Sequence, residues 1–162
     1  IVLPDMTDLS AVPDGTIGLA VMVHVLDHLL APLEMLEAIL PKMRPGGRLL
    51  AVTHNERSLL RDMMGTRWPP FCLQHPELYN SATIYGLMER AGFADIMVTG
   101  STNHFPIDFL GRQALLAAGL GKVRLPLPKH SIGLRLGNML TLATAPAQAA
   151  EARPRTPLES WA

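Results

Sequence analysis

The sequence predicts an α/β domain built on a doubly wound, mostly parallel sheet that lacks its N-terminal part. Three observations predict it. Ile17–Val25 is nearly unbroken, apolar and rich in β-branched residues, as is typical of a parallel strand covered on both faces. A helical pattern follows it, and Arg48–Thr53 then reads as a second buried strand, so the unit implies a right-handed crossover. The chain also starts directly in apolar Ile1–Leu3, which resembles the interior of a domain.

The composition excludes several classes of protein. The 162 residues suit one domain, and a hydrophobic fraction of 48% with 17% charged residues excludes a disordered chain. Fourteen basic and fourteen acidic residues give no net charge, which argues against a nucleic-acid partner. A single cysteine, Cys72, excludes an internal disulfide and indicates a reducing, cytoplasmic location. The longest apolar stretch, Ile17–Leu26, is well short of the ~20 residues that cross a bilayer.

The first half of the chain has clear turn and helix signals. Pro13–Thr16 is a predicted turn, and Pro32 can open a helix because its missing N–H costs nothing there. The stripe of that helix consists of Leu33, Leu36, Leu40 and Met43. Pro41 predicts a kink or an early stop, and Arg44–Gly47 predicts a turn before the second strand.

The second half begins with a long connection, 54–80, that has no clear period and is of the kind that carries function. Ser81 is the predicted N-cap of a helix that ends at Gly92 as C′ residue. The remaining predicted elements are a strand at Ala94–Thr99, a helix at Phe109–Gly119 and a strand at Met139–Thr144. Residues 146–162 are rich in alanine and proline and are expected to form a disordered tail.

Five segments in this order resemble the C-terminal half of a class I S-adenosylmethionine-dependent methyltransferase domain, which has a Rossmann-like fold. They are Asp5–Leu9, Pro13–Gly15, His24–His28, Leu40–Gly47 and Leu87–Phe93. Trp68–Pro76 is similar to the substrate-side segment of the members that act on small molecules, and the resemblance extends over residues 1–145. It implies S-adenosylmethionine as the cofactor. Gly18 departs from the family, which commonly has aspartate at that position.

The family's first elements are not in this sequence. A complete member begins with a strand, a glycine-rich turn and a second strand that ends in an acidic residue. A βαβ unit needs ~30 or more residues, so we expect at least that much sequence upstream. The 162 residues would hold about half of the cofactor pocket. They would also be poorly soluble alone, because the central strand would lose its neighbours.

The resemblance places the cofactor at the carboxyl ends of the strands. It implies that Asp5 accepts a hydrogen bond from the adenine amino group and that Met6 packs on the ring. Val23 and His24 would line the cleft with their backbone. The alternative for Asp5 is a residue that merely starts a turn.

Two histidines are candidates for catalysis. An oxygen nucleophile benefits from an imidazole that accepts its proton, so His28 and His75 are predicted to act as base or to orient the substrate. The alternative is that His28 packs near the following helix and His75 fixes the loop. Trp68 and Tyr79 are predicted to line the acceptor pocket; the alternative is that they anchor the long connection.

A metal interpretation is also open at His24–His28, which reads His-x-x-Asp-His. It is similar to the inverted zinc-peptidase motif, in which two histidines of one helix bind zinc. Aspartate replaces glutamate here, and His24 follows a strand, so the two histidines do not share a helical face. We therefore expect no metal ligands, with a zinc hydrolase as the minor alternative.

The resemblance implies methyl transfer to a small-molecule acceptor, at oxygen in preference to nitrogen or carbon. The main alternative is a truncated, non-catalytic domain that serves in assembly. The apolar and basic segment Phe109–Arg124 could contact a membrane surface, but a lid helix with a solvated edge is the expected form. The sequence leaves the acceptor and the oligomeric state open.

Overall fold

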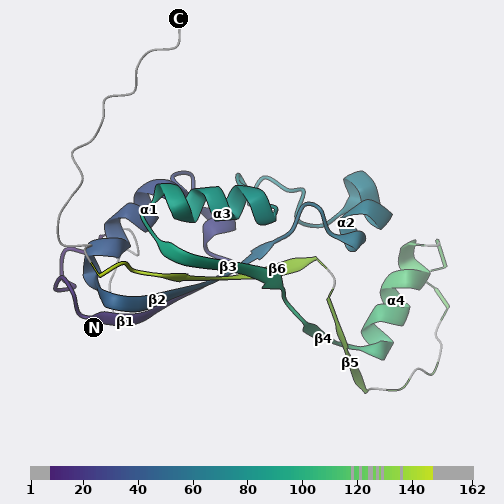
Figure 1. Ribbon diagram of the computed structural model, residues 1–162. Helices are drawn as coiled ribbons and strands as arrows, with labels where there is room; N and C mark the ends of the chain where they lie inside the picture. Colours follow the sequence, from purple (N-terminus) through teal and green to yellow (C-terminus); the bar gives the residue numbers. More distant parts are fainter. Residues whose placement is uncertain are drawn as a thin grey trace, which may run out of the picture.

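The computed structural model describes residues 8–147, except 118, 121, 124–125, 127, 129 and 136. Its centre is a four-stranded sheet in the order β1-β2-β6-β3 (Figure 1). The strands are β1 (Ile17–Val23), β2 (Met43–His54), β3 (Ala94–Gly100) and β6 (Asn138–Thr144). β1 is parallel to β2, and β6 is antiparallel to both β2 and β3, so the other three strands share one direction. The predicted α/β fold with a mostly parallel, Rossmann-like sheet is confirmed.

Two helices cover one face of this sheet, α1 (Pro32–Ile39) and α3 (Ser81–Arg90) (Figure 1). The apolar stripes of both helices point into the sheet, so Leu36 of α1 and Ile84 and Met88 of α3 are fully buried. The buried side chains of β1 and β2 pack against these helix residues. The hydrophobic core therefore lies between the helices and one side of the sheet.

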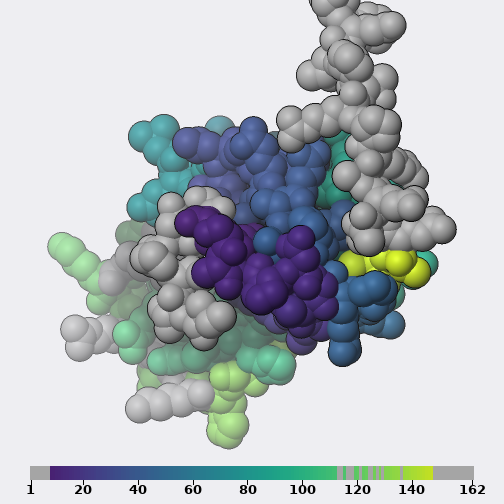
Figure 2. Space-filling model, turned by 90° about the vertical axis from the view of Figure 1, so that its left-hand side faces the viewer, coloured from purple at the N-terminus to yellow at the C-terminus, as the bar shows by residue number. Residues whose placement is uncertain are grey.

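The opposite face of β1 is open, which corrects the expectation of a strand covered on both faces. Leu19, Val21 and Val23 are 55–59% exposed, whereas Ala20 and Met22 between them are buried. Side chains alternate along a strand, and α1 and α3 lie on one side only. Figure 2 shows the purple residues around the start of β1 at the surface, below the blue residues that include α1. Among the described strands, β1 lies at an edge of the sheet, and a groove of about 360 Å³ runs along it.

The crossover from β1 to β2 differs in detail from the prediction. α1 ends at Ile39, and a 3₁₀ turn, η2 (Leu40–Lys42), holds Pro41, so the predicted stop is confirmed. Met43 opens β2 and does not continue the helical stripe. Arg44–Gly47 is part of β2 and not a separate turn, because Gly46 donates to Ala145 and Gly47 accepts from it. The register of β1 and β2 shifts there, so the glycines form an irregular strand end.

The caps of α3 are clear. The predicted N-cap, Ser81, is the first helical residue, and Asn80 is the N-cap. Its side chain accepts from the backbone N–H groups of Ala82 and Thr83, and Thr83 returns a contact to the backbone of Asn80, so the capping box is complete. Gly92 follows the helix at φ 94° and is the C′ residue that the sequence predicts.

The connection after β2 is not wholly irregular. It contains α2 (Leu59–Met64) and a 3₁₀ turn, η3 (Gly65–Arg67), which the sequence did not predict because they have no sustained period. A second, two-stranded sheet of β4 (Asn103–Pro106) and β5 (Ser131–Leu134) carries α4 (Ile107–Ala117) at the end of the main sheet (Figure 1).

Among the described residues, no helix has the length and apolar character to cross a membrane. The apolar segment at residues 1–3 lies outside the described residues, and so does nearly all of the expected tail, 146–162. The turn predicted at Pro13–Thr16 is confirmed, with Gly15 at φ 70° and the Thr16 hydroxyl donating to the Pro13 carbonyl.

Candidate functional site

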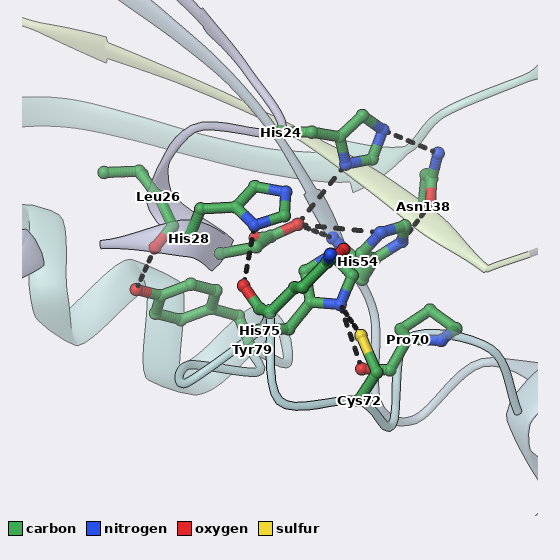
Figure 3. A network of polar contacts seen from close by, with 11 residues as sticks. His24, Leu26, His28, His54, Pro70, Cys72, His75, Tyr79 and Asn138 are labelled. Atoms are coloured by element: carbon green, nitrogen blue, oxygen red, sulfur yellow. Dashed lines mark hydrogen bonds and ion pairs between the residues drawn. The ribbon is translucent and has the colours of Figure 1, made fainter. Parts of the chain in front are cut away.

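The carboxyl ends of β1 and β2 meet at one end of the sheet, and each has a histidine there (Figure 3). His24 comes directly after β1, and His54 is the last residue of β2. The backbone N–H of His24 donates to Val52, so the chain leaves β1 in register with its neighbour. His24 then turns at φ 52°, a left-handed conformation that is uncommon for a residue with a side chain. The two imidazole rings lie 4.4 Å apart between centroids.

Asp27 and Asn138 join these two histidines. The amide nitrogen of Asn138 lies 3.4 Å from His24 Nε2, and its oxygen lies 3.0 Å from His54 Nδ1. An amide nitrogen only donates and an amide oxygen only accepts. His24 Nε2 is therefore an acceptor, and His54 Nδ1 is a donor. His24 Nδ1 in turn donates to Asp27 Oδ2 at 3.3 Å.

Asp27 is the charged centre of this network and is fully buried. Its Oδ2 also accepts from the backbone N–H of His54 at 3.1 Å, whereas its Oδ1 has no hydrogen-bond partner among the described residues. Burial lowers the pKa of His54, and the neighbouring Asp27 charge acts in the opposite direction. A buried carboxylate with an unpartnered oxygen is costly, so this end of the sheet is suited to a cation or a polar ligand.

The two predicted catalytic residues lie side by side. His28 belongs to a 3₁₀ turn, η1 (Leu26–His28), and its ring centroid is 4.4 Å from that of His75 in the long connection. His28 Nδ1 donates to the carbonyl of Gln74 at 2.7 Å, and His75 Nδ1 donates to the carbonyl of Pro70 at 3.1 Å. Each neutral ring therefore keeps its lone pair on Nε2. His75 also lies 5.1 Å from His54 between ring centroids, so both pairs belong to one cluster of four histidines.

The two predicted substrate residues are buried. Trp68 is 2% exposed, and its ring stands nearly perpendicular to the rings of His54 and Phe71. Tyr79 is 4% exposed and donates its hydroxyl to the carbonyl of Leu26. Burial raises the pKa of Tyr79, and the charge of Glu77 adds to that effect. Both side chains hold the long connection against the sheet. A contact with an acceptor stays a prediction for both.

The predicted cofactor residues are described only in part. Asp5 and Met6 lie outside the described residues, so the pairing of Asp5 with His24 stays a prediction. Val23 ends β1 with a half-exposed side chain, and His24 follows it. These two residues stand at the edge of the sheet where an α/β fold binds its ligand.

His54 and Asn138 are absent from the site that the sequence predicts. A signal for His54 was present, since it directly follows the predicted strand Arg48–Thr53, and ligands bind at such strand ends. Asn138 had no comparable signal. It opens β6, and only the antiparallel pairing of β6 with β2 brings it opposite His54.

Comparison with protein families shows what kind of domain this is. A family model described as a methyltransferase domain matches residues 4–98, more than half of the chain, so the chain belongs to the methyltransferase domain family. The resemblance predicted from the sequence is confirmed. No curated protein matches the chain by sequence at a significant level.

Solved structures agree on the fold. A SAM-dependent methyltransferase from Archaeoglobus fulgidus is 15% identical, with a TM-score of 0.56 over 88% of this chain and 66% of that one. A SAM-dependent methyltransferase from Thermotoga maritima, described as a possible histamine N-methyltransferase, is 15% identical, with a TM-score of 0.55 over 86% of this chain. The present chain spans 61% of that structure's length, so it is similar to a part of it. The expected cofactor, S-adenosylmethionine, agrees with the names of both structures.

Proposed function

We propose that the protein is an S-adenosylmethionine-dependent methyltransferase that methylates an oxygen atom of a small molecule. The methyltransferase domain family and the fold support the class of reaction. The cluster of histidines at the strand ends supports oxygen as the acceptor atom, because a hydroxyl group must lose a proton when it is methylated.

The described part of the cofactor site is compatible with S-adenosylmethionine. Val23 offers a half-exposed apolar side chain at the end of β1, and the His24 backbone turns away from the sheet beside it. When bound, S-adenosylmethionine supplies a methyl group carried on a sulfonium, which is transferred by in-line displacement. Asp5 and Met6 would complete the adenine side of this pocket.

The proposal that His28 or His75 is the base rests on one observation, the pairing of these two rings. A backbone carbonyl fixes Nδ1–H of each ring, so each Nε2 is free to accept a proton. The acceptor hydroxyl gives its proton to one of these Nε2 atoms as the oxygen–methyl bond forms. The electron pair of the breaking carbon–sulfur bond stays on sulfur. Trp68 and Tyr79 hold the connection that carries His75 against the sheet.

The first experiment measures cofactor binding. S-adenosylhomocysteine titrated into the protein in a calorimeter should bind saturably. The absence of binding at millimolar ligand would count against the transferase proposal as a whole.

The second experiment separates the acceptor atom from the cofactor. Small hydroxylated molecules and matched amines are incubated with methyl-labelled S-adenosylmethionine. We expect label in the hydroxylated set. Label in the amines alone would overturn the assignment to oxygen and leave the class of enzyme intact.

The third experiment tests the base. His75→Gln and His28→Gln are compared with His104→Gln, which changes an exposed histidine of β4. At least one of the first two should lower kcat by about 100-fold with little change in the binding of S-adenosylhomocysteine. Full activity in both would remove the histidines from the mechanism.

A non-catalytic role in assembly is the second candidate, and the open face of β1 favours it. Leu19, Val21 and Val23 are more exposed than apolar side chains of a central strand normally are. This candidate predicts no S-adenosylhomocysteine binding, so the first experiment separates the two. A cytoplasmic location and the absence of a nucleic-acid partner also stay predictions, supported by the single cysteine and the balanced charge.

A further inference from the structure

His24, Asp27 and His54 form a compact set of metal-ligating side chains at the ends of β1 and β2. One ligand atom from each lies within 4.8 Å of the others. His24 Nδ1 is 3.3 Å and His54 Nε2 is 3.9 Å from Asp27 Oδ2. Asp27 is fully buried, whereas the two histidine side chains are 31% and 21% exposed. The carboxylate is therefore shielded from solvent, whereas both histidine rings reach the surface in part; Figure 3 shows His24 and His54 near each other, with Asn138 beside them.

The buried carboxylate of Asp27 has less compensation than its charge requires. Within the described part of the chain, its two hydrogen bonds both end on Oδ2, from the His54 backbone and the His24 ring, and Oδ1 has none. A carboxylate has about four lone-pair positions that can accept hydrogen bonds. A buried carboxylate that accepts too few hydrogen bonds is costly in free energy. An additional positive charge at this point would supply the missing compensation.

Asn138 directs the lone pair of His54 toward the same point. Because His54 Nδ1 donates to the Asn138 oxygen, the neutral ring has its lone pair on Nε2. That Nε2 lies 3.9 Å from Asp27 Oδ2, so two electron-rich atoms lie near each other without a proton between them. A hydrogen bond from the other ring nitrogen to a carbonyl oxygen is how proteins commonly orient a metal-binding histidine.

We propose that His24, Asp27 and His54 bind a divalent transition-metal ion of the zinc type. Zinc bonds of about 2.0–2.2 Å to nitrogen and oxygen place neighbouring tetrahedral ligands about 3.3 Å apart. The distances from Asp27 Oδ2 to the two histidines, 3.3 and 3.9 Å, are close to that value. The ion binds the lone pairs of His54 Nε2 and His24 Nδ1. The proton that His24 Nδ1 held moves to Nε2 of the same ring, and the 3.4 Å contact of that Nε2 with the Asn138 nitrogen is given up. Three protein ligands leave a fourth position for water or another oxygen ligand.

This set differs from the one that the His-x-x-Asp-His pattern suggests. The pattern pairs His24 with His28, but His28 Nδ1 is held by the carbonyl of Gln74. His54, 30 positions beyond His24 in the sequence, takes its place. The proposal needs neither methyl transfer nor bound cofactor, so it stands independently of the proposed function.

Cobalt is a suitable probe because it occupies zinc sites and absorbs visible light. The purified protein is treated with chelator, dialysed and titrated with Co²⁺. We expect the strong d–d absorption of a four- or five-coordinate site, with one ion per chain, and its loss when Zn²⁺ is added. The absence of a saturable cobalt spectrum in the intact protein would overturn the proposal.

The ligands are then tested one at a time. His24→Ala, His54→Gln and Asp27→Asn should each weaken cobalt binding by at least about 100-fold, and Asn138→Ala by about 10-fold. His104→Ala on β4 is the matched control and should bind as the parent protein does. Unchanged affinity in the His24 and His54 variants would show surface binding only and would also overturn the site.

His28→Ala distinguishes the two ligand sets, because it should leave cobalt binding unchanged. A loss as large as that of His54→Gln would overturn the set in favour of the sequence pattern. Circular dichroism and thermal melting of each variant identify any loss of fold. If Asp27→Asn fails to fold, His54→Gln decides, since its side chain is partly exposed.

Discussion

The two faces of the main sheet differ although the same strands form them. On the face that α1 and α3 cover, Leu49 of β2 is fully buried beside Ala20 of β1. On the other face, Leu19 precedes Ala20 and is 59% exposed. Both residues are leucines in strands, so neither strand propensity nor hydrophobicity explains why one is buried and the other is exposed. The difference teaches that burial, and with it stability, is decided here by which side of the sheet the helices occupy.

The largest expected effect is on the covered face. Leu49→Ala removes a fully buried side chain and leaves a cavity between the strands and the helices. The free energy of unfolding should fall by about 3 kcal/mol. Urea denaturation followed by circular dichroism measures it. A loss below about 1 kcal/mol would mean that the covered face is not the core.

The next effect concerns the attachment of α3 to that face. Asn80→Ala removes the N-cap oxygen and the amide that donates to Glu56. We expect a loss of about 1–2 kcal/mol in the free energy of unfolding. Asn80→Ser is the control, because serine keeps a capping oxygen and loses the amide donor without adding a negative charge beside Glu56. If both variants unfold alike, the capping oxygen contributes nothing.

A smaller and pH-dependent effect is expected at Tyr79. Tyr79→Phe loses the hydrogen bond to the Leu26 carbonyl, worth about 1 kcal/mol at pH 8. Burial raises the pKa of Tyr79 in the folded protein above its unfolded value, so the native state holds this proton more tightly. The stability that the group contributes is present below the unfolded pKa, near 10, and is lost as the pH rises above it.

The effect is measured as the difference in stability between the parent protein and Tyr79→Phe in alkaline solution. The parent protein should lose more stability than Tyr79→Phe between about pH 9 and 11, because the variant has no phenol to ionise. Thermal melting at matched pH values gives both curves. Parallel curves would show that the phenol ionises as easily folded as unfolded.

The smallest effect is expected on the open face. Leu19→Ala should change the free energy of unfolding by less than about 0.5 kcal/mol, since more than half of its side chain already contacts water. It is the matched control for Leu49→Ala. A loss as large as that of Leu49→Ala would mean that the open face is covered in solution, and it would end the contrast between the two faces.

The predictable parts of this protein are those that short segments encode. The strands of the main sheet with α1 and α3, the helix end near Pro41 and the C′ role of Gly92 follow from periodicity and from the backbone limits of proline and glycine. The prediction was wrong where pairing overrides local preference. Gly46 and Gly47 look like a turn in the sequence, yet their hydrogen bonds to Ala145 make them part of a strand.

The site was predictable to a similar extent. His28 and His75 were selected by residue type, and the structure places their rings in contact. Neither their fixed Nδ1 protons nor the set of His24, Asp27 and His54 could be derived in this way. Both depend on backbone carbonyls and side chains that come from distant segments.

The sequence by itself determined the class of fold, the family resemblance and the histidines available for chemistry, because periodicity and residue type are local properties. The tertiary structure alone decided which face of β1 is buried and which histidines meet. It brings Asn138 to His54 across an antiparallel pair of strands separated by 84 positions. Hydrogen bonds and charge interactions act over a few ångströms of space, whatever the separation along the chain.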